Sequence, residues 1–174
     1  MTHRVAGLLL AFTAAAGPLG GQEAPDPAAG LDTLDGIVAA LYGSISGPAG
    51  DRDWGRFHSL FVPGAILLNA GPRPDTLPAP TPVSPRGYQE RAAPFFRENG
   101  FFESEIARTT HRYGTVAQVW STYESREEPG AEPFARGINS IVAVWHADRW
   151  WIASIIWDAE RPGSPIPEAY LPGG

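Results

Sequence analysis

The densest hydrophobic pattern of the chain lies between Gly137 and Asp158, in the stretch GINSIVAVWHADRWWIASIIWD. Two runs rich in Ile, Val and Trp, 138–145 and 150–157, flank a short polar break at 146–149. β-Branched and aromatic residues of this kind favour strands with at least one buried face. Because the break is short enough for a tight turn, the pattern predicts a β-hairpin.

The N-terminal half of the chain shows helical periodicity instead. Apolar residues recur at i, i+3 and i+4 over 31–45, and Gly and Pro then stop the pattern. A second amphipathic segment covers 51–61, with Asp51 as its expected N-cap. A third helix is expected to begin at Ser84, which is followed by Pro at the first helical position, and to run to about Glu98.

Shorter apolar segments predict the remaining strands, at 65–68, 101–110 and 115–125. A proline-rich loop, 70–85, interrupts the domain, and it is either a lid or rim of a site or an inert surface insertion. The order is therefore two helices, a strand, a helix and four antiparallel strands. This order predicts an α+β domain with helices packed on one face of a curved sheet.

Composition divides the 174 residues into four parts. Residues 1–21 have the positive end, apolar run and small residues of a secretion signal, which predicts an exported, periplasmic or extracellular protein that has no membrane contact once the signal is removed. An uncleaved anchor or a buried helix is the alternative. Residues 22–30 form a flexible linker, 31–160 the single globular domain and 161–174 a proline-rich tail.

Charge and residue usage exclude several classes of function. The formal net charge is -6 and all 13 basic residues are Arg, which argues against nucleic acid as a partner. No Cys is present, so neither disulfides nor thiolate chemistry is possible. The His and carboxylate spacing predicts no metal site, and the motifs predict no cofactor.

Three stretches carry a family resemblance in combination: DRDWGRFHSLFVPGAIL, GTVAQVWSTYES and RGINSIVAVWHADRWWIASIIWD. Together they resemble the nuclear transport factor 2-like superfamily, including its SnoaL-like (polyketide-cyclase-like) and steroid-isomerase branches. The resemblance covers roughly residues 31–160. It implies a cone-shaped, curved antiparallel sheet covered by the three N-terminal helices, a pocket inside the cone, and frequent homodimers through the outer sheet face.

The catalytic positions of the steroid-isomerase branch match this chain only in part. Tyr42 matches the family's helix tyrosine, but the carboxylate expected after the first strand falls at about Asn69. The carboxylate expected on a later strand falls near Ser140 or Ile141. Because an amide cannot act as a general base, the resemblance points to uncharacterised SnoaL-like members, and the catalytic residues stay unassigned.

A ligand site is predicted from residue type and from the family's strand orientation, at Tyr42, Trp54, Asn69, Gln118, Trp120, Asn139 and Trp157. Tyr42 is either a hydrogen-bond donor to a ligand oxyanion or a core tyrosine. The family fold implies that Gln118 and Trp120 face the pocket, while Val119 and Tyr123 face a dimer partner. Tyr42, Asn69, Trp120, Asn139 and Trp157 are expected to converge on one cavity under the proline-rich loop.

The remaining titratable candidates each have a functional and a structural interpretation. Glu103 and Glu105 share one strand face, which suits either an acid–base pair or a solvated surface. His58 and His111 are candidate general bases or structural histidines. Asp158 either closes the pocket mouth or caps the end of its strand.

These observations leave three functions open. The first is an exported domain that binds a small apolar or weakly polar ligand. The second is a cofactor-independent lyase, isomerase or cyclase, which needs an inward carboxylate or His with a shifted pKa. The third is a structural dimerisation module whose cone is filled by its own side chains.

Overall fold

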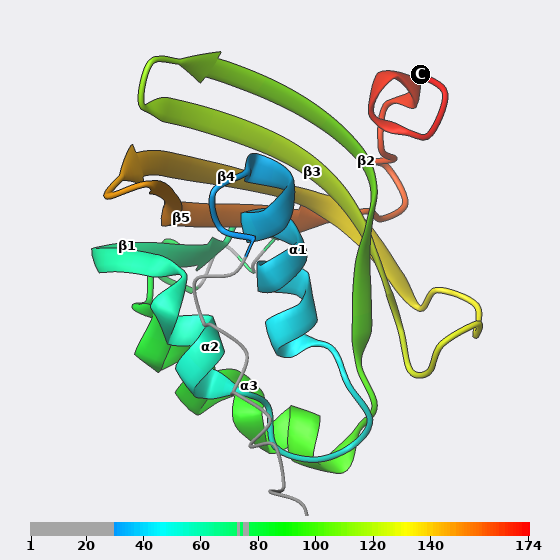
Figure 1. Cartoon of the computed structure of the whole chain (residues 1–174). Helices are drawn as coiled ribbons and strands as arrows, with labels where there is room; N and C mark the ends of the chain where they lie inside the picture. Colours follow the sequence, from blue (N-terminus) through cyan, green and yellow to red (C-terminus); the bar gives the residue numbers. More distant parts are fainter. Residues whose placement is uncertain (1–29, 73, 75–76) are drawn as a thin grey trace, which may run out of the picture.

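The computed structural model describes residues 30–72, 74 and 77–174. Within these residues, three α-helices and a five-stranded sheet form one α+β domain, as predicted (Figure 1). The predicted secretion signal and all but the last residue of the predicted linker lie outside the described residues. None of the described helices has the length and apolar character needed to span a bilayer.

The elements follow one another in the predicted order. They are α1 Leu34–Ile45, α2 Trp54–Ser59, β1 Phe61–Asn69, α3 Pro85–Glu98, β2 Phe102–Tyr113, β3 Val116–Arg126, β4 Ala135–His146, β5 Arg149–Ala159 and a short 3₁₀ helix, η1, at Glu168–Tyr170. The sequence pattern therefore located the three α-helices and the five strands of the described residues, whereas η1 was not predicted.

Side-chain caps define where the helices begin. Ser84 accepts the backbone N–H three residues further on at 3.1 Å, so α3 begins as predicted, with Pro85 in its first turn. The expected cap of α2 was wrong, because Asp53 rather than Asp51 accepts the N–H of Arg56, at 2.8 Å. Asp51 instead forms an exposed ion pair with Arg97.

The preceding Arg52 explains this shift. Its guanidinium donates to the carbonyl oxygens of residues 45, 47, 48 and 50 at 2.7–3.0 Å. These carbonyl groups belong to the end of α1 and the following loop, and Arg52 is 9% exposed. Because the loop is held in this way, α2 starts only after Asp53.

The sheet has the strand order β1-β5-β4-β3-β2 and is mixed rather than purely antiparallel. Strand β1 lies parallel to β5, and the other neighbours are antiparallel. β1 also begins earlier than predicted, at Phe61, and its register is irregular between Phe61 and Ile66. Pro63 has no N–H for a ladder, and such an interruption is tolerated because β1 is an edge strand.

The predicted hairpin is formed by β4 and β5. Its connection shrinks to two residues, Ala147 and Asp148, whose φ angles are 49° and 57°. Two left-handed residues in a two-residue loop match the twist of the flanking strands. The hairpin places Trp145 opposite Trp150.

The faces of β3 are the reverse of the prediction. Val119 and Ser121 are fully buried and Tyr123 is 6% exposed, all in the core between sheet and helices. Gln118 and Trp120 therefore lie on the outer face. Small side chains suit the inner face because α1 packs directly against it, as the Tyr42–Ser121 contact shows. Val119 and Tyr123 therefore do not face a dimer partner, and a charge introduced at Val119 would damage the core.

The C-terminal tail covers part of that outer face. The Thr122 hydroxyl donates to the Tyr170 carbonyl at 2.7 Å, and the rings of Trp120 and Tyr170 lie 5.8 Å apart. Figure 1 shows the C-terminus beside β2 and β3, outside the curved sheet. The tail thus shields an indole that the sequence had assigned to the pocket.

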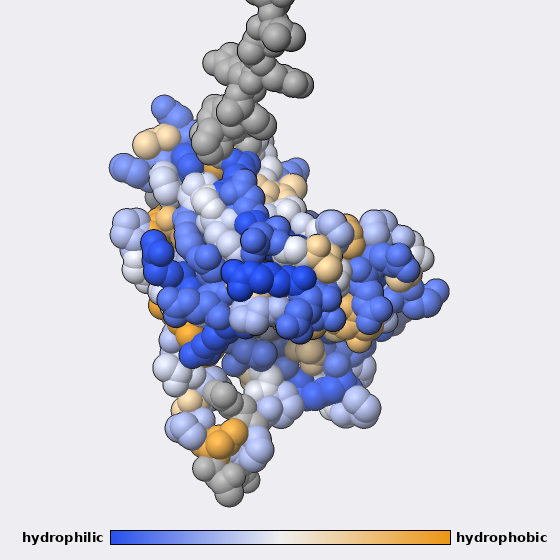
Figure 2. Space-filling model, turned by 90° about the horizontal axis from the view of Figure 1, so that it is seen from below, coloured by the Kyte–Doolittle hydropathy of each residue, from blue (hydrophilic) through white to orange (hydrophobic). Residues whose placement is uncertain are grey.

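The core fills the concave side of the sheet. Ile37 and Val38 of α1 are buried in the same cluster as Ile141 and Ile152 of the sheet. The end of the molecule that carries α2 and α3 is mainly hydrophilic, with apolar residues scattered over it (Figure 2). A site inside the curved sheet must therefore be a cavity within or beside this core.

Candidate functional site

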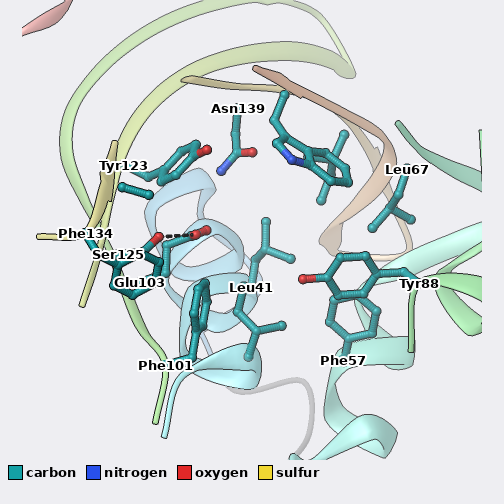
Figure 3. A pocket seen from close by; sticks show the side chains of 14 residues that line it. Leu41, Phe57, Leu67, Tyr88, Phe101, Glu103, Tyr123, Ser125, Phe134 and Asn139 are labelled. Carbon is teal, nitrogen blue, oxygen red and sulfur yellow. Dashed lines mark hydrogen bonds between the residues drawn. The ribbon is translucent and has the colours of Figure 1, made fainter. Parts of the chain in front are cut away.

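A cavity of about 230 Å³ lies between the concave sheet face and the helices (Figure 3). Its walls are mostly apolar and come from α1, α2, α3 and all five strands of the sheet, with Leu41, Phe57, Leu67, Phe101, Ile155 and Trp157 among them. Its polar groups are few: Tyr88, Glu103, Tyr123, Ser125 and Asn139. An apolar wall with a few convergent polar groups is the usual composition of a small-molecule site.

Glu103 supplies the carboxyl group of this cavity. It stands near the start of β2, opposite Ser125 of β3, whose hydroxyl donates to Glu103 Oε2 at 2.9 Å. Burial raises the pKa of Glu103 to about 7, although hydrogen bonds from Ser125 and Asn139 act in the opposite direction. A carboxyl group with this pKa is partly protonated and partly ionised near neutral pH.

Two phenol groups face the same space. Figure 3 shows the hydroxyls of Tyr88, from α3, and Tyr123, from β3, turned into the cavity. Burial raises the pKa of both phenols, so both are neutral at ordinary pH and can donate a hydrogen bond. Neither hydroxyl has a hydrogen-bond partner among the residues that the structure describes.

Gly137 makes room for the Tyr123 ring. The two residues are register partners on β4 and β3. A Cβ at position 137 would stand 2.5 Å from the Tyr123 hydroxyl and 2.4 Å from the Asp158 carbonyl oxygen. The absence of a side chain at this position therefore lets Tyr123 reach the cavity.

A buried hydrogen-bond relay lies behind the cavity wall. Asn139 Nδ2 donates to the Tyr42 hydroxyl at 3.1 Å, which is 2.7 Å from Ser121 Oγ. The Ser121 hydroxyl donates to Glu105 Oε1 at 2.6 Å. Arg108 holds the Glu105 carboxylate with bonds from Nε and Nη2, and it also pairs with Asp35 on α1.

The structure brings three of the predicted site residues together. Asn139 and Trp157 are register partners and line the cavity, and Tyr42 bonds to Asn139 from α1. Ser121 must donate its only proton to Glu105, so the Tyr42 proton goes to Ser121. Tyr42 therefore has no proton left for a ligand oxyanion, and the role predicted for it does not fit this geometry.

The other predicted site residues lie elsewhere. Trp54 stacks on Phe96 in the core, with ring centroids 6.1 Å apart. Asn69 uses its Oδ1 to accept the N–H of Gly71 at the end of β1. Gln118 and Trp120 are on the outer face, so the expected convergence of five side chains under the proline-rich loop is wrong for Trp120.

An outer cleft of about 730 Å³ adjoins the cavity. The two share Leu67, Tyr88, Phe101 and Trp157, so the cleft is the cavity's approach from solvent. Asn69 and Asp158 line this cleft, and Asp158 accepts from Arg161 at 2.7 Å. Pro72, Thr81 and Val83 show that the described part of the proline-rich loop forms a wall of the cleft.

The predicted histidine bases are not part of the cavity. His111 is exposed on β2, and His58 lies on α2 beside the Phe57 ring, at 5.9 Å between centroids. Within residues 30–72, 74 and 77–174, no group of three or more His, Asp or Glu side chains is arranged as a metal site. Proton chemistry in the cavity would therefore fall to Glu103.

Sequence reasoning missed Glu103, Tyr88, Tyr123 and Ser125 as cavity residues. Glu103 and Glu105 share one strand face, as predicted, but the sequence left open whether this face is solvated. The sequence did not show which face of β3 meets the helices. Glu103 is the register partner of Ser125 on β3, so its side chain lies on the same face of the sheet as that of Ser125. Gly137 could have indicated this orientation, because a residue without a side chain at that position leaves room for the Tyr123 ring on the inner face.

Comparisons with known proteins support the fold and no more. No family model and no curated protein matches the chain. Similar solved structures include a nuclear transport factor 2-like protein of unknown function from Pseudomonas putida, with a TM-score of 0.55, 9% identity and coverage of 72% of this chain and 82% of the other. A candidate ketosteroid isomerase from Parabacteroides distasonis matches with a TM-score of 0.51 and 12% identity, over 74% and 88% of the two chains.

A third similar structure is a candidate calcium/calmodulin-dependent protein kinase type II association domain from Thiobacillus denitrificans. Its TM-score is 0.57 at 11% identity, with coverage of 74% of this chain and 96% of the other. The protein thus has a nuclear transport factor 2-like fold, as the sequence resemblance implied. Identities this low show the fold alone and do not assign a ligand or a reaction to this chain.

Proposed function

We propose that this protein is exported and that it binds a small, mostly apolar molecule in the Glu103 cavity. The residue pattern of segment 1–21 supports export. The apolar walls and the few polar groups of the cavity support binding. At about 230 Å³ the cavity is smaller than the range of about 300–1,000 Å³ typical of drug-sized ligands, so a compact ligand fits best.

The observation that carries this proposal is the convergence of Glu103, Tyr88 and Tyr123 on one apolar space. The hydroxyls of Tyr88 and Tyr123 have no partner within the described protein and are not among its buried, unpaired polar atoms, so both are open to the cavity. A ligand with a polar group would supply the partners of the two phenols. A purely structural module with a filled cone would need neither the space nor the unpaired hydroxyls.

A second candidate function is favoured by the pKa of Glu103. A cofactor-independent lyase, isomerase or cyclase needs a base that is poised near neutral pH, and the pKa of about 7 meets that condition. Tyr88 and Tyr123 would then donate to the oxyanion that develops on the substrate. The similar structure from Parabacteroides distasonis is named for an isomerase, which is compatible with such chemistry on this fold.

The variant Glu103→Gln separates the two functions. An amide keeps the size of the side chain and can still accept from Ser125, but it cannot take up a proton. A binding protein should retain its affinity for a neutral apolar ligand within a few-fold. An enzyme should keep binding and lose turnover by roughly 10²–10⁴-fold, the usual contribution of a general base.

We also propose a homodimer through the outer sheet face, with the contact moved away from Val119 and Tyr123. Outward apolar residues such as Val142 and Ile156 remain partly exposed, Ile156 by 38%. The association domain from Thiobacillus denitrificans is named for assembly, which agrees with this proposal. Sedimentation should give a dimer for the wild type and a folded monomer for Val142→Glu.

A further inference from the structure

The relay behind the cavity has a fixed direction. Arg108 carries only donors, so the Glu105 carboxylate that it holds with Nε and Nη2 acts only as an acceptor. The single proton of Ser121 is therefore directed to Glu105 Oε1, across 2.6 Å. Ser121 Oγ is left as the acceptor for Tyr42, whose own proton points to it across 2.7 Å.

This direction reaches Asn139 in the cavity wall. Because the Tyr42 oxygen can only accept, it must face the amide nitrogen of Asn139 rather than the amide oxygen, which agrees with the 3.1 Å contact from Nδ2. The nitrogen also lowers the pKa of Glu103 through a hydrogen bond. Figure 3 shows the nitrogen turned toward Glu103 and Tyr123 and the oxygen turned away from them.

The Asn139 oxygen is left as an open acceptor. Asn139 is 7% exposed and lines the cavity. No side chain or backbone group of the described residues donates to Oδ1. The atom is also not among the buried, unpaired polar atoms of the described chain, so it is reachable from the cavity.

We propose that the Glu105–Arg108 ion pair is a positioning device for Asn139. Acting through Ser121 and Tyr42, it keeps the Asn139 carbonyl oxygen available to the cavity, so that the cavity selects a compact apolar molecule bearing a hydroxyl group. The hydroxyl donates to Asn139 Oδ1 and accepts from Tyr88, whose hydroxyl also points into the cavity. A ketone of the same skeleton can only accept, so it leaves Asn139 unpaired.

The orientation of Asn139 can be tested without any ligand. In Glu105→Gln, Arg108 takes the side-chain oxygen, so the new amide nitrogen faces Ser121 and donates to it. Ser121 then donates to Tyr42, Tyr42 donates to Asn139 Oδ1, and the Asn139 amide turns over. Its nitrogen leaves Glu103, which should raise the pKa of Glu103 by about one, as measured by carbon NMR titration of the carboxyl group.

The direction of this change distinguishes the relay from a simple charge effect. Removing the negative charge of Glu105 would by itself lower the pKa of Glu103. Ser121→Ala is a second variant that keeps the charge, and it leaves the Tyr42 proton free to turn toward Asn139 Oδ1. It too should raise the pKa of Glu103, and it remains informative if Glu105→Gln does not fold.

The matched control is Glu124→Gln, which removes the acid of another arginine ion pair, with Arg126, on the neighbouring β3. It should leave the pKa of Glu103 unchanged. A rise in Glu105→Gln and Ser121→Ala but not in the control supports the positioning role. A fall, or no change, in the two relay variants overturns it.

The ligand assignment rests on the proposed function and has its own test. The probes are 1-indanol and 1-indanone, which share a skeleton and differ in the hydroxyl proton. Wild type should bind the alcohol about fivefold to tenfold more tightly, the effect of one hydrogen bond, and Glu105→Gln should lose this preference. Equal affinities in the wild type overturn the hydroxyl assignment. If neither compound binds, the proposed function fails, whereas the Glu103 titration still decides the orientation of Asn139.

Discussion

Ser125 donates a hydrogen bond of 2.9 Å to Glu103 Oε2 inside a cavity whose walls are otherwise mostly apolar. The two residues face each other across β2 and β3, so the register of the sheet fixes the contact. Hydrogen bonds from Ser125 and Asn139 offset only part of the cost of burying the carboxylate, and the pKa of Glu103 accordingly stays at about 7. The sheet thus holds an acid that is near its point of ionisation.

The first prediction concerns stability against pH. The pKa of Glu103 is raised from 4.5 to about 7 on folding, so the folded state binds the proton more tightly than the unfolded state. Stability from this group is fully present below pH 4.5 and is lost as the pH rises to about 7. The difference in the free energy of unfolding between Glu103→Gln and wild type should therefore shift by about 3 kcal/mol in favour of the variant when the pH rises from 4.5 to 8.

Urea unfolding at the two pH values measures this difference. The control is Glu128→Gln, on an exposed loop between β3 and β4, which should show no such dependence. A constant difference between Glu103→Gln and wild type over this pH range would contradict the assignment of Glu103 as the buried acid.

The second prediction concerns the close approach at Gly137. A Cβ there would meet the Asp158 carbonyl oxygen at 2.4 Å, and a backbone atom in a sheet cannot move aside cheaply. Gly137→Ala should therefore cost about 1–3 kcal/mol in the free energy of unfolding and displace Tyr123 from the cavity. Gly43→Ala, on α1 with open space around it, should be neutral or stabilising by about 0.5–1 kcal/mol. Equal costs for the two variants would refute this account of the packing.

The third prediction concerns Arg52 at the end of α1. Its planar fork donates to four carbonyl groups, which a lysine cannot reproduce. Arg52→Lys should lower the free energy of unfolding by about 2–4 kcal/mol, because carbonyl groups lose their partners. Arg97→Lys changes an exposed ion pair and should cost less than about 1 kcal/mol. Thermal or urea denaturation compares them, and a small cost at Arg52 would mean that water replaces its bonds.

The fourth prediction concerns the tail over β3. Tyr170 contacts Trp120 and shields its indole, whose Nε1 is buried without a partner in the described chain. Tyr170→Ala should admit water and shift the Trp120 indole N–H resonance in a nitrogen–proton NMR spectrum. Tyr113→Ala, at a residue that is 91% exposed, should leave that resonance in place. An unmoved Trp120 signal in both variants would show that the tail is not docked in solution.

The order of the elements was predictable from the sequence because each depends on local chemistry. The Ser84-Pro85 start of α3 and the Ile- and Trp-rich hairpin are examples, since caps and strand propensity act within a few residues. The parallel pairing of β1 with β5 was not predicted, because it joins segments far apart in the chain.

The candidate site was less predictable because it depends on which face of β3 meets the helices. A one-residue error in orientation exchanges every inward side chain for an outward one, and it misplaced Trp120 and Tyr123 together. Tryptophan is a common pocket residue, but Trp120 is covered by a tail that the sequence did not connect to β3. Asn139 and Trp157 do line the cavity, and both belong to the strongly patterned hairpin, whose register pairs them.

The measurement that tests the central claim most directly is a methyl NMR titration with small apolar alcohols, using wild type and a variant with a blocked cavity. Ala135→Trp places a large ring at the cavity wall, and Tyr113→Trp places the same ring at a position that is 91% exposed, as a control. Wild type and Tyr113→Trp should show ligand-dependent shifts of the Leu41 and Ile155 methyl groups, and folded Ala135→Trp should show none. Shifts that persist in Ala135→Trp, or that appear only on the outer face, would contradict a binding site at Glu103.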